Sequence, residues 1–208
     1  MGFRPTKTGF ELEKGAFYNF CKKAEIDIDN KYFFIIDEIN RGNLSKIFGE
    51  LFMLIEKDKR GKQLQLLYKD EKFAVPENVY IIGMMNTADR SLAMLDYALR
   101  RRFGFYEIKP GFNTEGFRDY RKSLNNEKFN KLINCVEKLN SIIISDESLG
   151  KGFCIGHSYF CGLTPEKLDE QWLYSVVEYE LIPLLKEYWF DDPTKVKEWS
   201  ENLRSAIK

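Results

Sequence analysis

Residues 32–42 read Tyr-Phe-Phe-Ile-Ile-Asp-Glu-Ile-Asn-Arg-Gly, so that an apolar run of five residues ends in two adjacent acids, Asp37 and Glu38. The run is too short for a buried helix and is typical of a β-strand that is covered on both faces. Open α/β sheets bind ligands at the carboxyl ends of their strands, which is where both acids would lie. Such a pair suits phosphoryl chemistry, because one carboxylate can hold hydrated Mg²⁺ while the next polarises the attacking water. A solvated acidic turn is the alternative interpretation of the pair alone.

A second apolar run, residues 79–86, also ends in a polar side chain, Asn86. Between the two runs, residues 43–57 have the spacing of an amphipathic helix, and residues 63–75 resemble a hairpin on the edge of the sheet. This connection allows a right-handed crossover, so we expect the two strands to pair in parallel. The two acids and Asn86 would then lie on one edge of one sheet.

The remaining segments predict a division of the chain into two domains. From residue 113 onward the sequence shows only amphipathic helical stripes, one of them bent near Pro183. Because Pro110-Gly111 precedes this change, we expect an α/β domain at 1–112 and a helical domain at 113–208. The shorter elements expected in the first domain are a loop or hairpin at 1–14, a helix at 15–25, a loop at 87–91, a helix through residue 101 and a short strand at 103–108.

Composition limits the function classes. The chain has 208 residues, of which 44% are hydrophobic and 31% are charged, as in a globular protein. Its 32 basic and 32 acidic residues cancel, so net charge does not favour nucleic-acid binding. No apolar run is long enough for a membrane span, no signal-peptide pattern opens the sequence, and the four cysteines lack the pattern of a secreted scaffold. We therefore expect reduced thiols and a cytoplasmic location.

Three segments in order resemble the motifs of one family. Residues 35–42 resemble a Walker B segment, residues 85–92 (Met-Asn-Thr-Ala-Asp-Arg-Ser-Leu) resemble a family signature at the place of sensor 1, and residues 95–103 resemble an arginine-finger segment. Together they resemble the McrB family of AAA+ proteins, the GTPase subunits of modified-cytosine restriction systems. The resemblance is dense over about residues 2–112 and continues more weakly through 155–160 and 181–185. It implies an α/β AAA+ P-loop NTPase sheet domain, here without the P-loop strand, followed by an all-helical lid domain.

The resemblance also implies roles for individual residues. Asp37 would bind Mg²⁺ through water, and Glu38 would orient the lytic water together with Asn86. Asn40 would lie beside them at the nucleotide. These roles agree with the chemistry that the two strand ends suggest on their own.

Two further groups of residues receive roles from the resemblance alone. Asp89 and Arg90 belong to the signature loop near the γ-phosphate. Arg101 and Arg102 would reach the nucleotide of a neighbouring subunit. Because consecutive helical residues point about 100° apart, Arg100, Arg101 and Arg102 cannot all face one phosphate, and the sequence does not say which of them does.

One expected motif is missing from the sequence. No Gly-x-x-x-x-Gly-Lys-Ser/Thr occurs in the 208 residues, and this P-loop supplies the backbone cradle and the lysine for the phosphates. GTP or ATP with Mg²⁺ is therefore expected as a cofactor only if a P-loop comes from outside this chain. The partners that the resemblance implies are other AAA+ subunits in a ring, a hexamer in the family, a McrC-type nuclease subunit, and DNA through a separate domain; no membrane partner is expected.

Three other interpretations compete with a nucleotide-hydrolysing subunit. Cys154, His157 and Cys161 suggest a metal site, but structural zinc needs a fourth ligand, and we favour a hydrogen-bonded role for His157. DNA binding through residues 100–102 lacks both net positive charge and a recognition motif. An AAA+ assembly module that packs in a ring without turning over nucleotide is the stronger alternative, and a P-loop on a partner would distinguish it from an enzyme.

Overall fold

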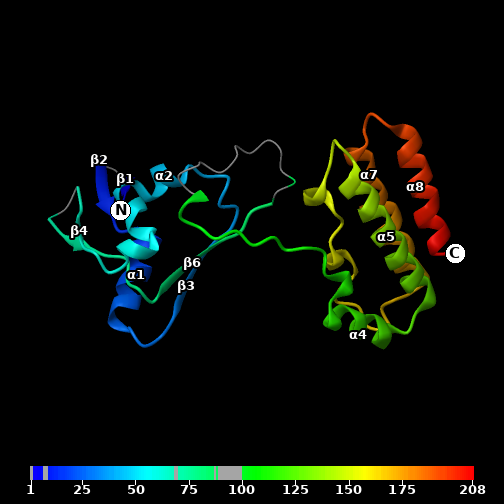
Figure 1. Cartoon of the computed structure of the whole chain (residues 1–208), viewed down its shortest axis with the longest axis horizontal. Coiled ribbons are helices and arrows are strands. Elements are labelled where there is room, and N and C mark those ends of the chain that lie inside the picture. The colour runs from blue at the N-terminus through cyan, green and yellow to red at the C-terminus, as the bar shows by residue number, and fades with distance from the viewer. Residues whose placement is uncertain (1, 7–8, 68–69, 87, 89–99) are drawn as a thin grey trace. The chain divides into compact units, whose positions relative to one another are not determined.

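The computed structural model describes residues 2–6, 9–67, 70–86, 88 and 100–208 (Figure 1). The chain divides into two compact units, Met1–Phe105 and Tyr106–Lys208. In the part of the chain that is described, no helix combines the length and the apolar character that a membrane span requires. The boundary expected at 112/113 stays a prediction, and Phe112 packs into the core of the second unit.

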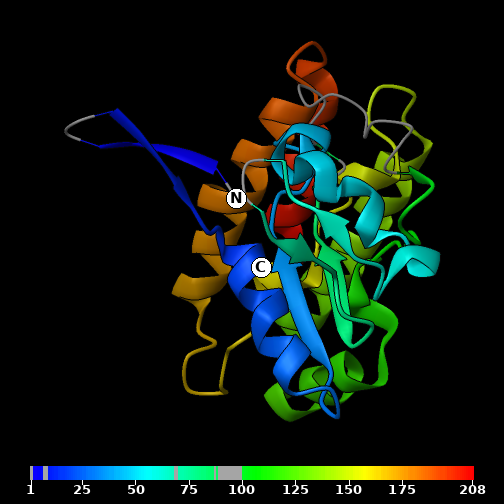
Figure 2. The same cartoon turned by 90° about the vertical axis from the view of Figure 1, so that its left-hand side faces the viewer.

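The first unit is built around a parallel pair of strands. β3 (Tyr32–Ile36) pairs with β6 (Val79–Gly83) in a register that sets Tyr32 opposite Val79 and Ile36 opposite Gly83. The parallel pairing expected from the sequence is therefore present. Helix α1 (Ala16–Ile26) packs on β3, as Figure 2 shows, with the Phe17 and Phe20 rings 5.0 and 5.1 Å from that of Phe34.

Only one face of this strand pair is well covered. Phe33 and Ile35 are 53% and 59% exposed, and Tyr80 and Ile82 on the neighbouring strand are each 44% exposed. The Phe33 and Tyr80 rings stack at 5.3 Å. The expectation of a strand covered on both faces is thus wrong for this chain, because α1 packs against alternate side chains and the others point to the opposite face.

Several elements of the first unit differ from the expectation. The helix expected at 43–57 is shorter in the structure, where α2 covers only Leu44–Phe48. It ends there because Gly49 has a φ of +51°, which does not continue an α-helix. 3₁₀ turns follow at Gly49–Ile55 and Lys57–Lys59. The expected hairpin forms, but β4 (Leu64–Gln65) and β5 (Lys72–Phe73) make a sheet of their own. β1 (Gly2–Thr6) and β2 (Gly9–Glu13) form an antiparallel hairpin. Residues 103–108 are irregular rather than a strand, and most of the helix expected up to residue 101 lies outside the described residues.

The second unit is helical. Several of its helices begin at a residue whose side chain caps the first turn. These side chains accept a hydrogen bond from a backbone N–H in that turn, and they belong to Thr114, Asn126, Asp169 and Asp192. A π-helical stretch at Val176–Leu181 joins two of the helices, and Pro183 lies in the first turn of the second, near the expected bend. The helices are α4 (Glu115–Leu124), α5 (Glu127–Ser145), α6 (Glu170–Ser175), α7 (Ile182–Tyr188) and α8 (Pro193–Ala206).

A closed core and two polar clusters stabilise this unit. Phe129 and Phe160 are fully buried in the core. The buried Asn140 side chain on α5 donates to the carbonyl of Ile155 at 2.9 Å and accepts from its N–H at 2.7 Å. At the end of α5, Asp146 accepts from the indole of Trp189, the ammonium of Lys195 and the hydroxyl of Ser148, which fixes the starts and ends of three helices relative to one another.

Candidate functional site

The ends of β3 and β6 stay joined beyond their last paired residues. The Met84 N–H donates to the Ile36 carbonyl, and the Ile39 N–H donates to the Met84 carbonyl, both at 2.9 Å. Asp37 and Glu38 follow β3 directly, and Asn86 follows β6 after two intervening residues. The structure therefore brings the carboxyl ends of both strands to one edge, which is where ligands bind in open α/β sheets.

The turn after β3 holds Glu38 in a strained conformation. Its φ is +51°, a left-handed value that costs a side-chain-bearing residue about 1–2 kcal/mol. Asp37 helps to hold the turn, because its Oδ1 accepts from the Glu38 N–H at 2.9 Å. On the neighbouring strand only glycine fits at Gly83, since a Cβ there would meet the Ile39 side chain at 2.4 Å. Strain of this kind is common at functional sites, where it aims a side chain.

Two buried acceptor oxygens lie in this turn without a hydrogen-bond donor among the described residues. They are Oε2 of Glu38 and Oδ1 of Asn40. The Glu38 oxygen has an ionic neighbour, Arg41 Nε at 3.1 Å, although the guanidinium N–H does not form a hydrogen bond with it. Arg41 balances the charge of the Glu38 oxygen, whereas Asn40 Oδ1 has no donor among the described residues. Buried acceptors normally have a donor, so the Asn40 oxygen points to a ligand or water in this position.

The donor set fits Mg²⁺ better than a metal held by protein ligands alone. Within the described ranges, no group of three His, Cys, Asp or Glu side chains could surround a cation. Mg²⁺ keeps several of its waters and usually takes only one or two carboxylates, together with substrate phosphates. Asp37, whose side chain is exposed at the strand end, has the chemistry for such a role.

Of the predicted site residues on the loop after β6, the structure describes Asn86 but not Asp89 and Arg90. The Asn86 side chain is exposed, and its Oδ1 accepts from the Ala88 N–H at 3.0 Å. Asp89 and Arg90 lie outside the described residues. Asn86 therefore follows the end of β6 at the same edge of the sheet as the end of β3, and the roles of Asn86 and of the signature loop stay predictions.

The two arginines after this loop have different surroundings. Arg102 is only 12% exposed, forms a 2.6 Å ion pair with Glu56, and lies 4.1 Å above the Phe52 ring. Arg101 is exposed. The sequence analysis did not predict Glu56 as a partner of Arg102, because an acid forty-six residues away carries no local signal.

The histidine and cysteines of the second unit are engaged in local contacts. His157 Nδ1 accepts from the Gly111 N–H at 3.0 Å, and its ring packs edge-on against Phe112 and Phe117. The Cys161 thiol donates to the His157 carbonyl. Burial raises the pKa of the thiols of Cys154 and Cys161, which disfavours the thiolate that binds zinc.

Two family models match the chain. The model of the AAA domain (dynein-related subfamily) matches residues 1–103, and the model of the McrB α-helical lid domain matches residues 131–197. Together they correspond to the sheet unit and the helical unit, so the fold class expected from the sequence is confirmed: a partial AAA+ α/β domain followed by a helical lid.

Two curated proteins are similar over most of this chain. The Type IV methyl-directed restriction enzyme EcoKMcrB subunit of Escherichia coli (strain K12) is 51% identical over 216 residues, which cover 98% of this chain and 46% of that protein. The Type II restriction enzyme BsuMI component YdiS of Bacillus subtilis (strain 168) is 27% identical over 199 residues, which cover 86% of this chain and 54% of that protein. The chain thus spans about half the length of the curated relatives it matches. With both domain models and this degree of identity, the chain belongs to the McrB-like AAA+ proteins.

Proposed function

We propose that this chain carries the metal- and water-positioning side of a nucleotide-hydrolysing site, in a McrB-like subunit that hydrolyses GTP with Mg²⁺. The supporting observation is the common edge formed by the ends of β3 and β6, where Asp37 and Glu38 follow β3 and Asn40 Oδ1 has no donor among the described residues. The preference for GTP over ATP rests on the resemblance to the McrB family.

Each residue at this edge has a chemical task in the proposal. Mg²⁺, when bound, would neutralise charge on the phosphates as the terminal phosphoryl group transfers. Asp37 would hold a water of the metal shell, and Glu38 would polarise the attacking water with its negative charge. The left-handed turn at Glu38 ends the strand and holds that residue in a fixed backbone conformation. Asn86 would hold the same water from the neighbouring strand, and Asn40 would contact the nucleotide.

The phosphate cradle has to come from another segment or chain, because the 208 residues contain no P-loop sequence. The same absence favours the second candidate, an AAA+ assembly module that joins a ring without turning over nucleotide. By similarity to the restriction-enzyme relatives, either form would act in a DNA restriction system with a McrC-type partner and other AAA+ subunits, in the cytoplasm.

The deciding experiment joins the chain to a P-loop segment and measures GTP turnover. Glu38→Gln should keep nucleotide binding and lower turnover at least about 100-fold, because the amide keeps the shape but loses the charge. Asp37→Asn should instead weaken Mg²⁺-dependent binding. Glu25→Gln and Asp29→Asn, on the surface of the same unit, are the matched controls. Unchanged turnover in the Glu38 variant would contradict the role of Glu38, and no turnover by the joined wild-type protein would favour the assembly module.

We assign the role across the subunit boundary to Arg101 rather than to Arg102. Arg101 is exposed, whereas Glu56 and Phe52 already bind Arg102 within its own unit. An arginine supplied from a neighbour can contribute about 10³–10⁵ in rate. Mixing the joined Glu38→Gln protein with joined Arg101→Ala should restore part of the activity that each lacks. If mixed oligomers form and no activity returns, Arg101 does not act in trans; the same mixture with Arg102→Ala provides the comparison.

A further inference from the structure

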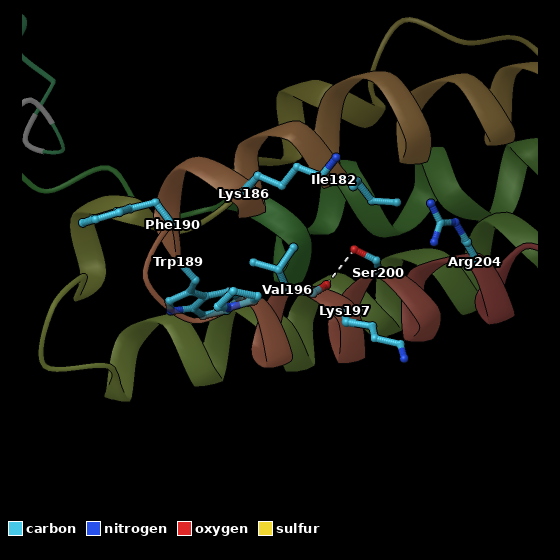
Figure 3. Close-up of a pocket in the computed structure, with 9 residues that line it drawn as sticks. Ile182, Lys186, Trp189, Phe190, Val196, Lys197, Ser200 and Arg204 are labelled. Atoms are coloured by element: carbon cyan, nitrogen blue, oxygen red, sulfur yellow. Dashed lines mark hydrogen bonds between the residues drawn. The ribbon is translucent and has the colours of Figure 1, made fainter.

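A groove of about 490 Å³ opens between α7 and α8 in the second unit (Figure 3). Figure 3 shows Ile182 and Lys186 on one wall, and Val196, Ser200 and Arg204 on the other. The full lining is Ile182, Lys186, Trp189, Phe190, Pro193, Val196, Lys197, Ser200 and Arg204.

The floor of the groove is apolar. Ile182 and Trp189 are buried beneath it, Val196 is half-buried, and Phe190 at one end is 81% exposed. The buried Ser200 hydroxyl donates to the Val196 carbonyl at 2.7 Å, so it presents no unsatisfied polar group to the floor. A bulky apolar side chain could therefore lie on this floor without leaving a polar group of the groove unpaired.

The rim of the groove is basic. Among the described residues that line it, Lys186, Lys197 and Arg204 are charged and none is acidic. Arg204 is already neutralised by Glu178, with 2.8 Å between Nη2 and Oε2, and this bond holds the pKa of Glu178 below its usual range. Lys186 and Lys197 are exposed, and neither forms an ion pair within the described part of the chain, although the charge of Lys186 also helps to lower the pKa of Glu178. Two positive charges outside ion pairs thus flank an apolar floor.

We propose that this groove binds an acidic peptide segment of a protein partner, with one bulky apolar side chain on the floor and carboxylates on either side. From Pro193 to Arg204 the groove follows eleven residue steps of α8, or about 17 Å. An extended segment of about five residues spans that distance. Acidic residues beside an apolar one match the lysines and the floor together, and charge complementarity of this kind fixes register and partner choice.

The observations favour a peptide over nucleic acid. A nucleic-acid backbone is recognised by a row of cations, whereas here two free lysines flank an aliphatic and aromatic floor. The chain as a whole also carries no net charge. The proposal concerns a docking surface of the lid unit and does not depend on nucleotide hydrolysis.

The test is fluorescence anisotropy with the 208-residue chain and a labelled peptide that has two acidic residues on each side of a central leucine. Two comparison peptides replace the acids by their amides or the leucine by serine, and a labelled single-stranded oligonucleotide represents nucleic acid. Saturable binding of the first peptide is expected, weakened by added salt and by either replacement. Lys186→Glu with Lys197→Glu should weaken binding by about tenfold or more.

The control variant is Lys138→Glu with Lys167→Glu, which changes net charge equally on exposed positions of the same unit outside the groove. It should keep near wild-type binding. Lys186→Gln with Lys197→Gln, checked by circular dichroism, separates loss of the lysines from any loss of folding and should also bind several-fold more weakly. Equal effects of the groove and control pairs, indifference to the acids or the leucine, or tighter binding of the oligonucleotide would each overturn the proposal.

Discussion

The two units of this protein differ in how far their large apolar side chains are buried. In the helical unit Phe129 and Phe160 are fully buried, and α5 contributes six buried residues to one apolar core. In the sheet unit Phe33 and Ile35 lie on β3 and remain more than half exposed. The helical unit therefore closes its core with its own residues, whereas the described residues of the sheet unit leave one apolar face of the strand pair open. The candidate nucleotide site lies at the edge of this less complete unit.

The largest expected change in stability distinguishes the two units when a phenylalanine in each is replaced by alanine. Phe129→Ala should destabilise the helical unit by about 4 kcal/mol, because it removes a buried ring and leaves a cavity. Phe33→Ala should cost the sheet unit less than about 1 kcal/mol, since it removes an exposed ring and one aromatic contact. The three tryptophans, Trp172, Trp189 and Trp199, all lie in the helical unit, so their fluorescence during urea unfolding reports on it selectively. Hydrogen exchange of the β3 amides reports on the sheet. Similar losses in the two units would refute the contrast.

A smaller effect is expected from the polar contact that fastens the loop before His157 to α5. Asn140→Ala removes two hydrogen bonds and leaves both backbone groups of Ile155 without their side-chain partner, in a buried position. The expected loss is about 3 kcal/mol in the tryptophan-monitored unfolding of the helical unit. Asn202→Ala, on the exposed face of α8, should change stability by less than about 0.5 kcal/mol. An Asn140 loss no greater than that of Asn202 would mean that this contact adds nothing to the closed core.

A pH-dependent effect of about 1–2 kcal/mol is expected at Asp146. The ion pair with Lys195, followed by the bonds from Ser148 and Trp189, holds the pKa of Asp146 well below its usual range. A carboxyl whose pKa is lower in the folded state contributes stability above its unfolded pKa, about 3.9, and loses it as pH falls further. The difference in unfolding free energy between wild type and Asp146→Asn should therefore be constant near neutral pH and shrink below about pH 4. Asp191→Asn, an exposed acid nearby, serves as the control, and a difference that grows on acidification would contradict the assignment.

The parts of the fold that could be predicted are those with a local cause. The apolar run of β3 and the helical spacing of α5 each lie within a short stretch of sequence, and the sequence predicts both elements. The expected helix at 43–57 is broken by the left-handed Gly49, which hydrophobic spacing does not reveal. The expected cover on both faces of β3 is wrong because it depends on which other segments pack there.

In the candidate site, too, features with a local cause could be predicted, whereas features that depend on distant contacts could not. The place of Asp37 and Glu38 after an apolar strand predicts their position at a sheet edge, and the parallel pairing puts the end of β6 beside them. Two ion pairs were found only in the structure. One joins Glu38 to Arg41, and the other joins Arg102 to Glu56. Side-chain partners depend on rotamers and on contacts between distant segments, for which the sequence carries no periodic signal. The roles of these residues in hydrolysis stay predictions.

In the proposed arrangement, the sheet edge that carries Asp37, Glu38 and Asn86 is one side of a nucleotide site and needs a phosphate cradle from elsewhere. Titration calorimetry of GTP with Mg²⁺ can decide this with three proteins: the 208-residue chain alone, the same chain joined to a P-loop segment, and the joined chain with Asp37→Asn. We expect no saturable heat from the chain alone, because a P-loop carries most of the phosphate contacts, clear binding by the joined chain, and weaker Mg²⁺-dependent binding by its Asp37 variant. Micromolar binding by the chain alone, or joined binding that is indifferent to Asp37, would contradict the account.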